Sequence, residues 1–124
     1  QRSFDQGNTK GYNRIGFLHV VGIDGRKNFD AAYDYFQKAA DLGDPFAINN
    51  IGILYQNGLH FHPKNIQKAF EFFEQAAKMH EPFSLFNLAK MYESGTFLKQ
   101  DHQLAQYYYS EAAKYGHPSS VQKS

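Results

Sequence analysis

Histidine is the residue type in this chain that most directly suggests metal chemistry. Six histidines occur among the 124 residues, and His60 and His62 lie two apart. Two imidazoles at this spacing can share a transition metal, but a protein site needs a third or fourth ligand, and none lies nearby in the sequence. The chain has no cysteine, which excludes a cysteine-ligated metal and a cysteine nucleophile from it. We therefore expect no metal and no other cofactor.

Neither the carboxylates nor the glycines form a catalytic pattern. The aspartates of the first third of the chain fall at varied helical phases, and no glutamate faces them at equivalent positions, so a paired acid and base is not indicated. Residues 22–27 contain two glycines and two basic residues, but they lack the order of a phosphate-binding loop and follow a predicted helix instead of a strand. We expect no enzymatic activity in this chain.

The bulk composition disfavours several classes of partner. Thirteen Lys and Arg stand against twelve Asp and Glu, a formal charge of +1, and neither sign forms a run, so nothing indicates binding to nucleic acid. No apolar stretch approaches the roughly 18 residues that cross a bilayer, so direct membrane insertion is not expected. Residues 1–10 also lack the basic start and apolar core of a secretion signal.

The elements that would position any site form a repeat. An aromatic residue, an Ala-Ala pair, a Gly-type stop and a Pro recur in phase three times. Pro45, Pro82 and Pro118 are separated by 37 and 36 residues, and the alanine pairs ending at residues 40, 77 and 113 keep the same spacing. A period of this length is typical of stacked helical hairpins.

Each repeat contains two predicted helices. The first helices are expected at residues 9–21, 45–57 and 82–94, and the second helices at 29–42, 66–79 and 102–115. Asn28, Asn65 and Asp101 are suitable N-caps for the second helices, while Asp44 and Glu81 cap the next first helices. Helices of this length are marginal alone in water, so stacking against neighbours must stabilise them.

We therefore predict an all-α fold, a right-handed α-solenoid (an α/α superhelix) of stacked helix-turn-helix repeats. Residues 1–124 form one repeat domain. Its complete repeats span 7–43, 44–80 and 81–116, residues 1–6 are the tail of a preceding repeat, and residues 117–124 begin a further one.

Small and large residues alternate where the helices should meet. Gly16, Gly52 and Ala89 share one position in the first helices, and a helical glycine costs about 1 kcal/mol relative to alanine. Its recurrence predicts two helices too close for a side chain. Twelve Phe and nine Tyr fall mostly at repeat-equivalent positions, which favours core packing over a stacking platform for bases or ligands. Phe36 is predicted to be buried.

The repeat resembles the Sel1-like repeat, a helical-hairpin relative of the tetratricopeptide repeat. The family pattern is Leu-Gly-x-Leu-Tyr-x-x-Gly, a loop, then Ala-x-x-x-aromatic-x-x-Ala-Ala-x-x-Gly. Residues 51–58 read Ile-Gly-Ile-Leu-Tyr-Gln-Asn-Gly and are followed by Ala69 through Ala77, and the third unit repeats this order. The match covers residues 7–118. The chain departs from the pattern at His19, Ala89 and His80, and His80 should loosen its turn because glycine suits a left-handed cap better.

The resemblance implies a protein-protein interaction scaffold or adaptor that binds a partner protein or peptide on its concave face. It further implies a degradation or signalling complex, such as ER-associated degradation, and an ER-lumenal, periplasmic or secreted location, while the sequence leaves the cytoplasm open. The absence of cysteine disfavours the family's disulfide-rich secreted branch. An alternative is a non-catalytic targeting or regulatory appendage of an enzyme whose catalytic domain lies outside this segment.

First helices generally line the concave face of such arrays, and residues that differ between equivalent positions there should be free of packing constraints. The first unit offers apolar residues on this face and the third offers charge. An open alternative is that Phe17 and Val20 cover a neighbouring repeat. Self-association through the repeat ends is a further expectation. The partner-binding candidates are Asn13, Phe17, Val20, Val21, Asn49, Ile53, Gln56, Asn57, Phe86, Lys90 and Glu93.

Overall fold

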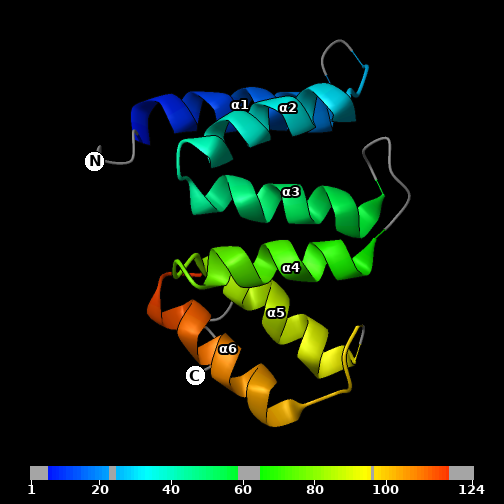
Figure 1. Ribbon diagram of the computed structural model, residues 1–124, viewed down its shortest axis with the longest axis vertical. Helices are drawn as coiled ribbons and strands as arrows, with labels where there is room; N and C mark the ends of the chain where they lie inside the picture. The colour runs from blue at the N-terminus through cyan, green and yellow to red at the C-terminus, as the bar shows by residue number, and fades with distance from the viewer. Residues whose placement is uncertain (1–5, 23–24, 59–64, 96, 118–124) are drawn as a thin grey trace.

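The computed structural model describes residues 6–22, 25–58, 65–95 and 97–117. These residues form six helices and no strand, and the helices stack in chain order along the long axis (Figure 1). The two helices of each hairpin pack together, and each second helix also packs on the next first helix. The predicted all-α solenoid is confirmed. The helices are α1 (Gln6–Val21), α2 (Phe29–Asp41), α3 (Pro45–Asn57), α4 (Ile66–Ala77), α5 (Pro82–Ser94) and α6 (His102–Lys114).

Most predicted helix bounds hold, and the differences have local causes. α1 begins at Gln6, a residue that the sequence had assigned to a preceding repeat, because no proline sets its start as Pro45 and Pro82 do for α3 and α5. The second helices end one or two residues early. Their last turns close with hydrogen bonds between residues three apart instead of four. In α2, for example, Leu42 N–H donates to the Ala39 carbonyl at 3.1 Å. Residues 1–5 and 118–124 lie outside the described residues.

The predicted caps are present. The side-chain oxygens of Asn28, Asn65 and Asp101 each accept a 3.0 Å hydrogen bond from the backbone N–H three residues later. Asp44 caps α3 by accepting from Phe46 N–H, and Glu81 caps α5 by accepting from Phe83 and Ser84 N–H, each immediately before the proline that opens its helix. The start of each of these helices is therefore defined by local contacts.

His80 takes a left-handed backbone conformation, with φ of 64°. Its counterparts Gly43 and Gly116 have φ of 96° and 104°. The same backbone hydrogen bond closes all three turns, running at His80 from Glu81 N–H to the Ala76 carbonyl at 3.2 Å. The turn is not loosened, contrary to expectation. The non-glycine residue instead carries a backbone cost of about 1–2 kcal/mol, and its ring stacks on Tyr115 at 4.5 Å.

The close approach predicted at the small residues is present. A Cβ atom built on Gly16 would lie 2.6 Å from Cε1 of Phe36, and one on Gly52 would lie 2.7 Å from Cε1 of Phe73. Both phenyl rings are fully buried, at 1% and 0% exposure. The first two hairpins are thus each held by a ring seated directly on the backbone of the first helix.

The remaining aromatic residues of the repeat connect neighbouring helices. In each unit, one aromatic ring of the first helix stacks on a ring of the second helix of the same unit. In the second and third units, this ring also contacts, edge to face, a ring of the second helix of the preceding unit. His19 stacks in the place that tyrosine occupies elsewhere. The stacked pairs are His19–Tyr35, Tyr55–Phe72 and Tyr92–Tyr108 at 5.6–5.9 Å, and the edge-to-face pairs are Tyr33–Tyr55 and Phe70–Tyr92 at 6.1–6.4 Å.

Candidate partner-binding surface

The sequence-predicted candidates all lie on α1, α3 and α5, but they differ in exposure. Phe17 and Val21 are 57% and 62% exposed. We call the side of the three first helices that carries these and the other exposed candidates the first-helix face. The other exposed candidates are Asn57, Lys90 and Glu93, the half-buried ones are Asn13, Val20, Ile53, Gln56 and Phe86, and Asn49 is buried.

Asn49 cannot contact a partner through its side chain. It is only 1% exposed, and its Oδ1 atom accepts hydrogen bonds from Ser84 Oγ at 2.8 Å and from Asn87 Nδ2 at 3.0 Å. Both donors belong to α5, so Asn49 joins two neighbouring first helices. The expectation that Asn49 binds a partner is wrong.

The equivalent residues of the other units make similar contacts. Asn13 Nδ2 donates to Asp44 Oδ2 at 2.6 Å, and the ring of Phe86 stacks on His117 at 4.0 Å. Asp44 and His117 occupy equivalent positions, one residue before a repeat proline. The position of Asn13, Asn49 and Phe86 therefore varies between units together with the residue that it contacts in the next unit. Variation here reflects a paired contact and not freedom from packing.

Two buried polar atoms lie where the first helices of units one and two meet, at the site equivalent to the Asn49–Asn87 contact between units two and three. Asn13 Oδ1 and Asn50 Nδ2 have no hydrogen-bond partner within the described residues. They are the counterparts of Asn49 Oδ1 and Asn87 Nδ2, which bond to each other. Since unmatched buried amides are costly, repeat equivalence predicts that these two atoms pair, directly or through a water molecule.

His117 should make stability depend on pH. Its side chain is 5% exposed, lies against Phe83 and Phe86, and has its pKa lowered from 6.5 by burial and then by the positive charge of Lys90. The folded pKa lies below the unfolded one, so the contribution of neutral His117 is fully present above pH 6.5 and is lost as pH falls below that value. Urea unfolding should therefore show lower stability at about pH 5.5 than at about pH 7.5.

The variant His117→Gln should reduce this pH dependence, whereas His102→Gln, at an exposed position, should leave it unchanged. If His117→Gln loses as much stability on acidification as the unmodified chain, the buried histidine is not the cause.

The charges on α5 are partly engaged within the protein. Tyr109 Oη donates to Glu93 Oε1 at 2.5 Å, and partial burial together with this hydrogen bond raises the pKa of Tyr109 to about 12. Lys90 Nζ lies 5.5 Å from the ring centroid of Phe86, a cation–π distance. The third unit therefore uses much of its predicted charge internally.

The first unit forms a hollow. A space of about 550 Å³ is lined by Lys10, Asn13, Arg14 and Phe17 of α1 and by Phe46 of α3. A second space of about 360 Å³ shares Lys10, Asn13 and Phe46 with it. The sequence had proposed Asn13 and Phe17 but not the other three lining residues. These residues also differ between equivalent repeat positions, which was the criterion used to choose Asn13 and Phe17, since Lys10 corresponds to Phe46 and Arg14 to Asn50.

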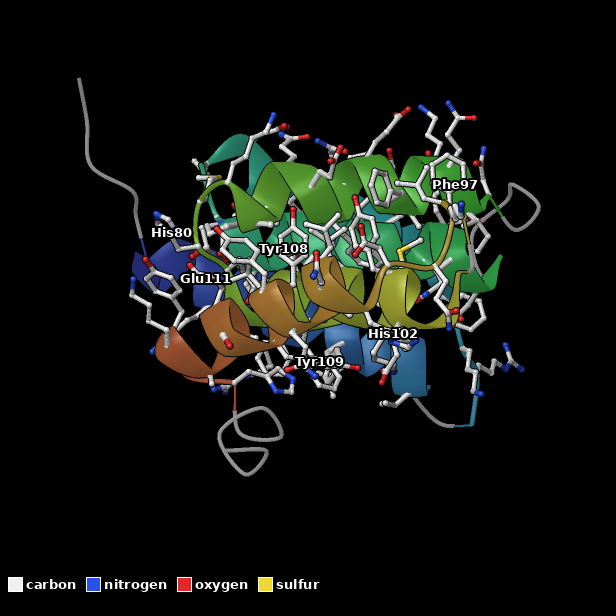
Figure 2. The ribbon with its side chains drawn as sticks, turned by 90° about the horizontal axis from the view of Figure 1, so that it is seen from below. His80, Phe97, His102, Tyr108, Tyr109 and Glu111 are labelled. Carbon is white, nitrogen blue, oxygen red and sulfur yellow. The ribbon has the colours of Figure 1, made fainter. Side chains whose placement is uncertain are left out.

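A smaller hollow of about 240 Å³ lies on the opposite set of helices, between α4 and α6. His80, Tyr108 and Glu111 line it and are labelled in Figure 2. Burial is the main cause that raises the pKa of Tyr108. Although its lining includes a histidine and two carboxylates, no group of three or more His, Asp or Glu residues able to hold a metal occurs in the described part of the chain.

His60 and His62, the residues that first suggested a metal, lie outside the described residues. Among the described helices, none is long and apolar enough to cross a membrane.

The fold and the paired contacts between first helices define a helical-hairpin solenoid. The family model described as Sel1 repeat matches residues 9–44, 45–80 and 82–117. The chain belongs to the Sel1 repeat family. Proteins of this family are generally non-catalytic protein-protein interaction modules.

Several solved structures share the fold. A Sel1 repeat protein from Oxalobacter formigenes is 32% identical with a TM-score of 0.80 over 91% of this chain and 46% of its own. A protective antigen of uropathogenic Escherichia coli with an SLR fold is 21% identical (TM-score 0.77, 92% of this chain and 24% of its own). Cysteine-rich protein B of Helicobacter pylori is 17% identical (TM-score 0.72, 94% and 92%). The chain therefore spans less than half the length of the first two. A sequence comparison with curated proteins found no match.

Proposed function

We propose that this chain binds a partner protein or peptide through the first-helix face, with Phe17 and Val21 of α1 as principal contacts. The observation that carries the proposal is their exposure of 57% and 62%, the highest among the large apolar side chains of the described residues, at two positions one helical turn apart. Val20, Ile53, Gln56, Asn57, Lys90 and Glu93 are proposed as further contacts.

Repeat equivalence argues against the alternative that Phe17 covers a neighbouring repeat. In α3, which packs on α2, Ile51 and Leu54 are buried at 1% and 2% exposure, and their counterparts in α1 are Ile15 and Leu18. A helix stacked on α1 would therefore cover Ile15 and Leu18. Phe17 corresponds to Ile53, which is half-buried in α3, and to Lys90, which stays exposed although α4 lies against α5. Stacking therefore leaves this position at least partly exposed in both later units.

Val21 supports the same distinction. Its counterparts Asn57 and Ser94 are exposed in both later units. Val20 differs, because it is half-buried and packs against the core cluster, so part of its apolar surface is explained by the fold. Among the exposed candidates of the first-helix face, the apolar surface is thus that of Phe17 and Val21.

The double variant Phe17→Ser/Val21→Ser tests this proposal. Removing two exposed apolar side chains should weaken partner binding at least about tenfold, since each well-buried apolar contact contributes about 1 kcal/mol or more, and should leave the melting temperature nearly unchanged. The measurement is affinity capture with the unmodified chain and mass spectrometry, followed by titration of the recovered protein against both forms.

Leu42→Ser/Leu104→Ser is the matched control, because these side chains are 42% and 37% exposed, at the end of α2 and on α6, and line neither space beside Phe17. A large loss of stability in Phe17→Ser/Val21→Ser, or equal weakening in the control, would contradict the proposed surface.

As an adaptor in a degradation or signalling complex, such as ER-associated degradation, the chain would bind its partner through the first-helix face. As a targeting or regulatory appendage of an enzyme, it would use the same face. The identity and compartment of the captured partner distinguish the two.

A further inference from the structure

Charge is unevenly shared between the two sets of helices. The first helices carry Lys10, Arg14 and Lys90 and a single acidic residue, Glu93. The second helices carry three lysines and six acidic residues. The formal charge of +1 for the whole chain therefore conceals a basic set of first helices and an acidic set of second helices.

Two of the three first-helix cations meet at one place. Lys10 and Arg14 are exposed and line the hollow of about 550 Å³ together with Asn13, Phe17 and Phe46. None of the described residues that line it is acidic. The hollow thus presents two cations beside two phenyl rings.

The two carboxylates that line the adjoining space, Asp44 and Glu81, are both engaged as helix caps. Asp44 is 7% exposed, accepts the 2.6 Å hydrogen bond from Asn13, and accepts a second bond from Phe46 N–H at the start of α3. Its charge is therefore stabilised at the positive end of a helix. Lys10 and Arg14 remain available to an anionic group.

Resting on the proposed function, we propose that this hollow binds an acidic segment of a partner protein. An aliphatic or aromatic side chain of the segment packs against Phe17 and Phe46, and flanking Asp or Glu residues pair with Lys10 and Arg14. The apolar contact supplies affinity by removing the exposed ring of Phe17 from water. The carboxylates supply specificity and speed the encounter.

A second copy of the chain fits this surface less well. Pairing α1 with its own copy would bring Lys10 and Arg14 against identical charges. Placing α6 of another copy on the outer side of α1 would bring the exposed polar residues His102 and Gln106 onto Ile15 and Leu18. The corresponding residues of α2 are Phe29 and Tyr33, which are apolar and partly buried. Charge and polarity therefore favour a separate acidic segment.

Selection from a random phage-displayed peptide library against the unmodified chain tests the proposal. We expect enriched peptides with Asp or Glu flanking an aliphatic or aromatic residue. Fluorescein-labelled copies of these peptides, titrated by fluorescence anisotropy, should bind Lys10→Glu/Arg14→Glu at least about tenfold more weakly. Raising NaCl from about 50 to about 300 mM should also weaken binding to the unmodified chain.

The matched control is Lys38→Glu/Lys78→Glu, which makes the same change in net charge at two exposed lysines away from the hollow. It should stay within about twofold of the unmodified chain, because screening limits the effect of distant surface charge.

The other outcomes separate this inference from the proposed function. Enriched peptides without acidic residues, or acidic peptides that bind both charge variants equally, would overturn the acidic-segment proposal and leave the protein-binding function standing. Failure to enrich any peptide would count against both. Two further results would overturn the proposal if no acidic peptide was enriched. Self-association in sedimentation experiments that Lys10→Glu/Arg14→Glu abolished would assign the hollow to a second copy of the chain. Binding to phosphatidylglycerol-containing vesicles that the same variant abolished would assign it to an anionic lipid surface.

Discussion

Replacing Phe36 with alanine should lower the free energy of unfolding by about 3–5 kcal/mol. The side chain is 1% exposed, and its ring rests on the backbone of α1 at Gly16, where an added Cβ would lie 2.6 Å from the ring. Because Gly16 has no side chain, nothing on that side can move in to fill the space left by the ring. A loss near the upper end of the range for buried phenylalanine is therefore expected.

Urea unfolding followed by circular dichroism measures this effect. Domains are commonly stable by only about 5–15 kcal/mol, so the variant should lose a large share of its stability. Hydrogen exchange should place the loss first in α1 and α2, since stacked repeats interact mainly with their neighbours. Leu42→Ala, which truncates a 42% exposed side chain, should change stability by less than about 1 kcal/mol. Equal losses in the two variants would contradict the seating of Phe36 on Gly16.

The sequence predicted the helices well where local chemistry defines their ends. Both ends of α3 and α5 are set by a cap and a proline at the start and by Gly58 or Gly95 with positive φ after the last turn. α1 lacks the proline and began earlier than predicted. The ends of the second helices depend on how the last turn tightens, a choice that residue type alone does not fix.

The candidate surface was less predictable, because whether a residue there is free to bind a partner depends on which residue of the next unit it contacts. Position 13 and its equivalents vary between units, which in one sequence looks like freedom from packing. Asn13, Asn49 and Phe86 in fact each contact a matched residue in the next unit. A single chain with three repeats shows that a position changes, but it does not show which second position changes with it.

The hollow and the charge separation were hidden for a different reason. Lys10 and Phe46 are far apart in sequence and meet only because α1 and α3 are neighbours in the stack. The formal charge of +1 averages the basic first helices with the acidic second helices. Both features follow once each residue is assigned to its helix and each helix to its side of the array.

Replacing Gly52 with valine should destabilise the fold by about 2–3 kcal/mol. Helix propensity alone predicts the opposite sign, since valine is a somewhat better helix former than glycine. The loss arises because even a Cβ atom at this position would lie 2.7 Å from Cε1 of Phe73, and Phe73 is 0% exposed and has no free space to enter. Urea unfolding measures the change.

The third unit of the chain supports the expected sign of this change. In the third unit the small residue is Ala89, and the aromatic residue equivalent to Phe73 is Tyr109, which is only half-buried. Where a methyl group replaces the glycine hydrogen, the facing ring is less deeply seated.

Gly11 supplies the matched control, because it also lies within a first helix but has no atom within 4 Å of an added Cβ. Gly11→Val should therefore be neutral or slightly stabilising, and Phe73→Leu should recover part of the loss in Gly52→Val by giving the new side chain room. If Gly52→Val were as stable as Gly11→Val, the helices of a hairpin could separate at little cost, and the recurring glycine would need another explanation. A loss at Gly52 but not at Gly11 would show that the distance between α3 and α4 is set by the ring of Phe73 packed against the backbone of α3.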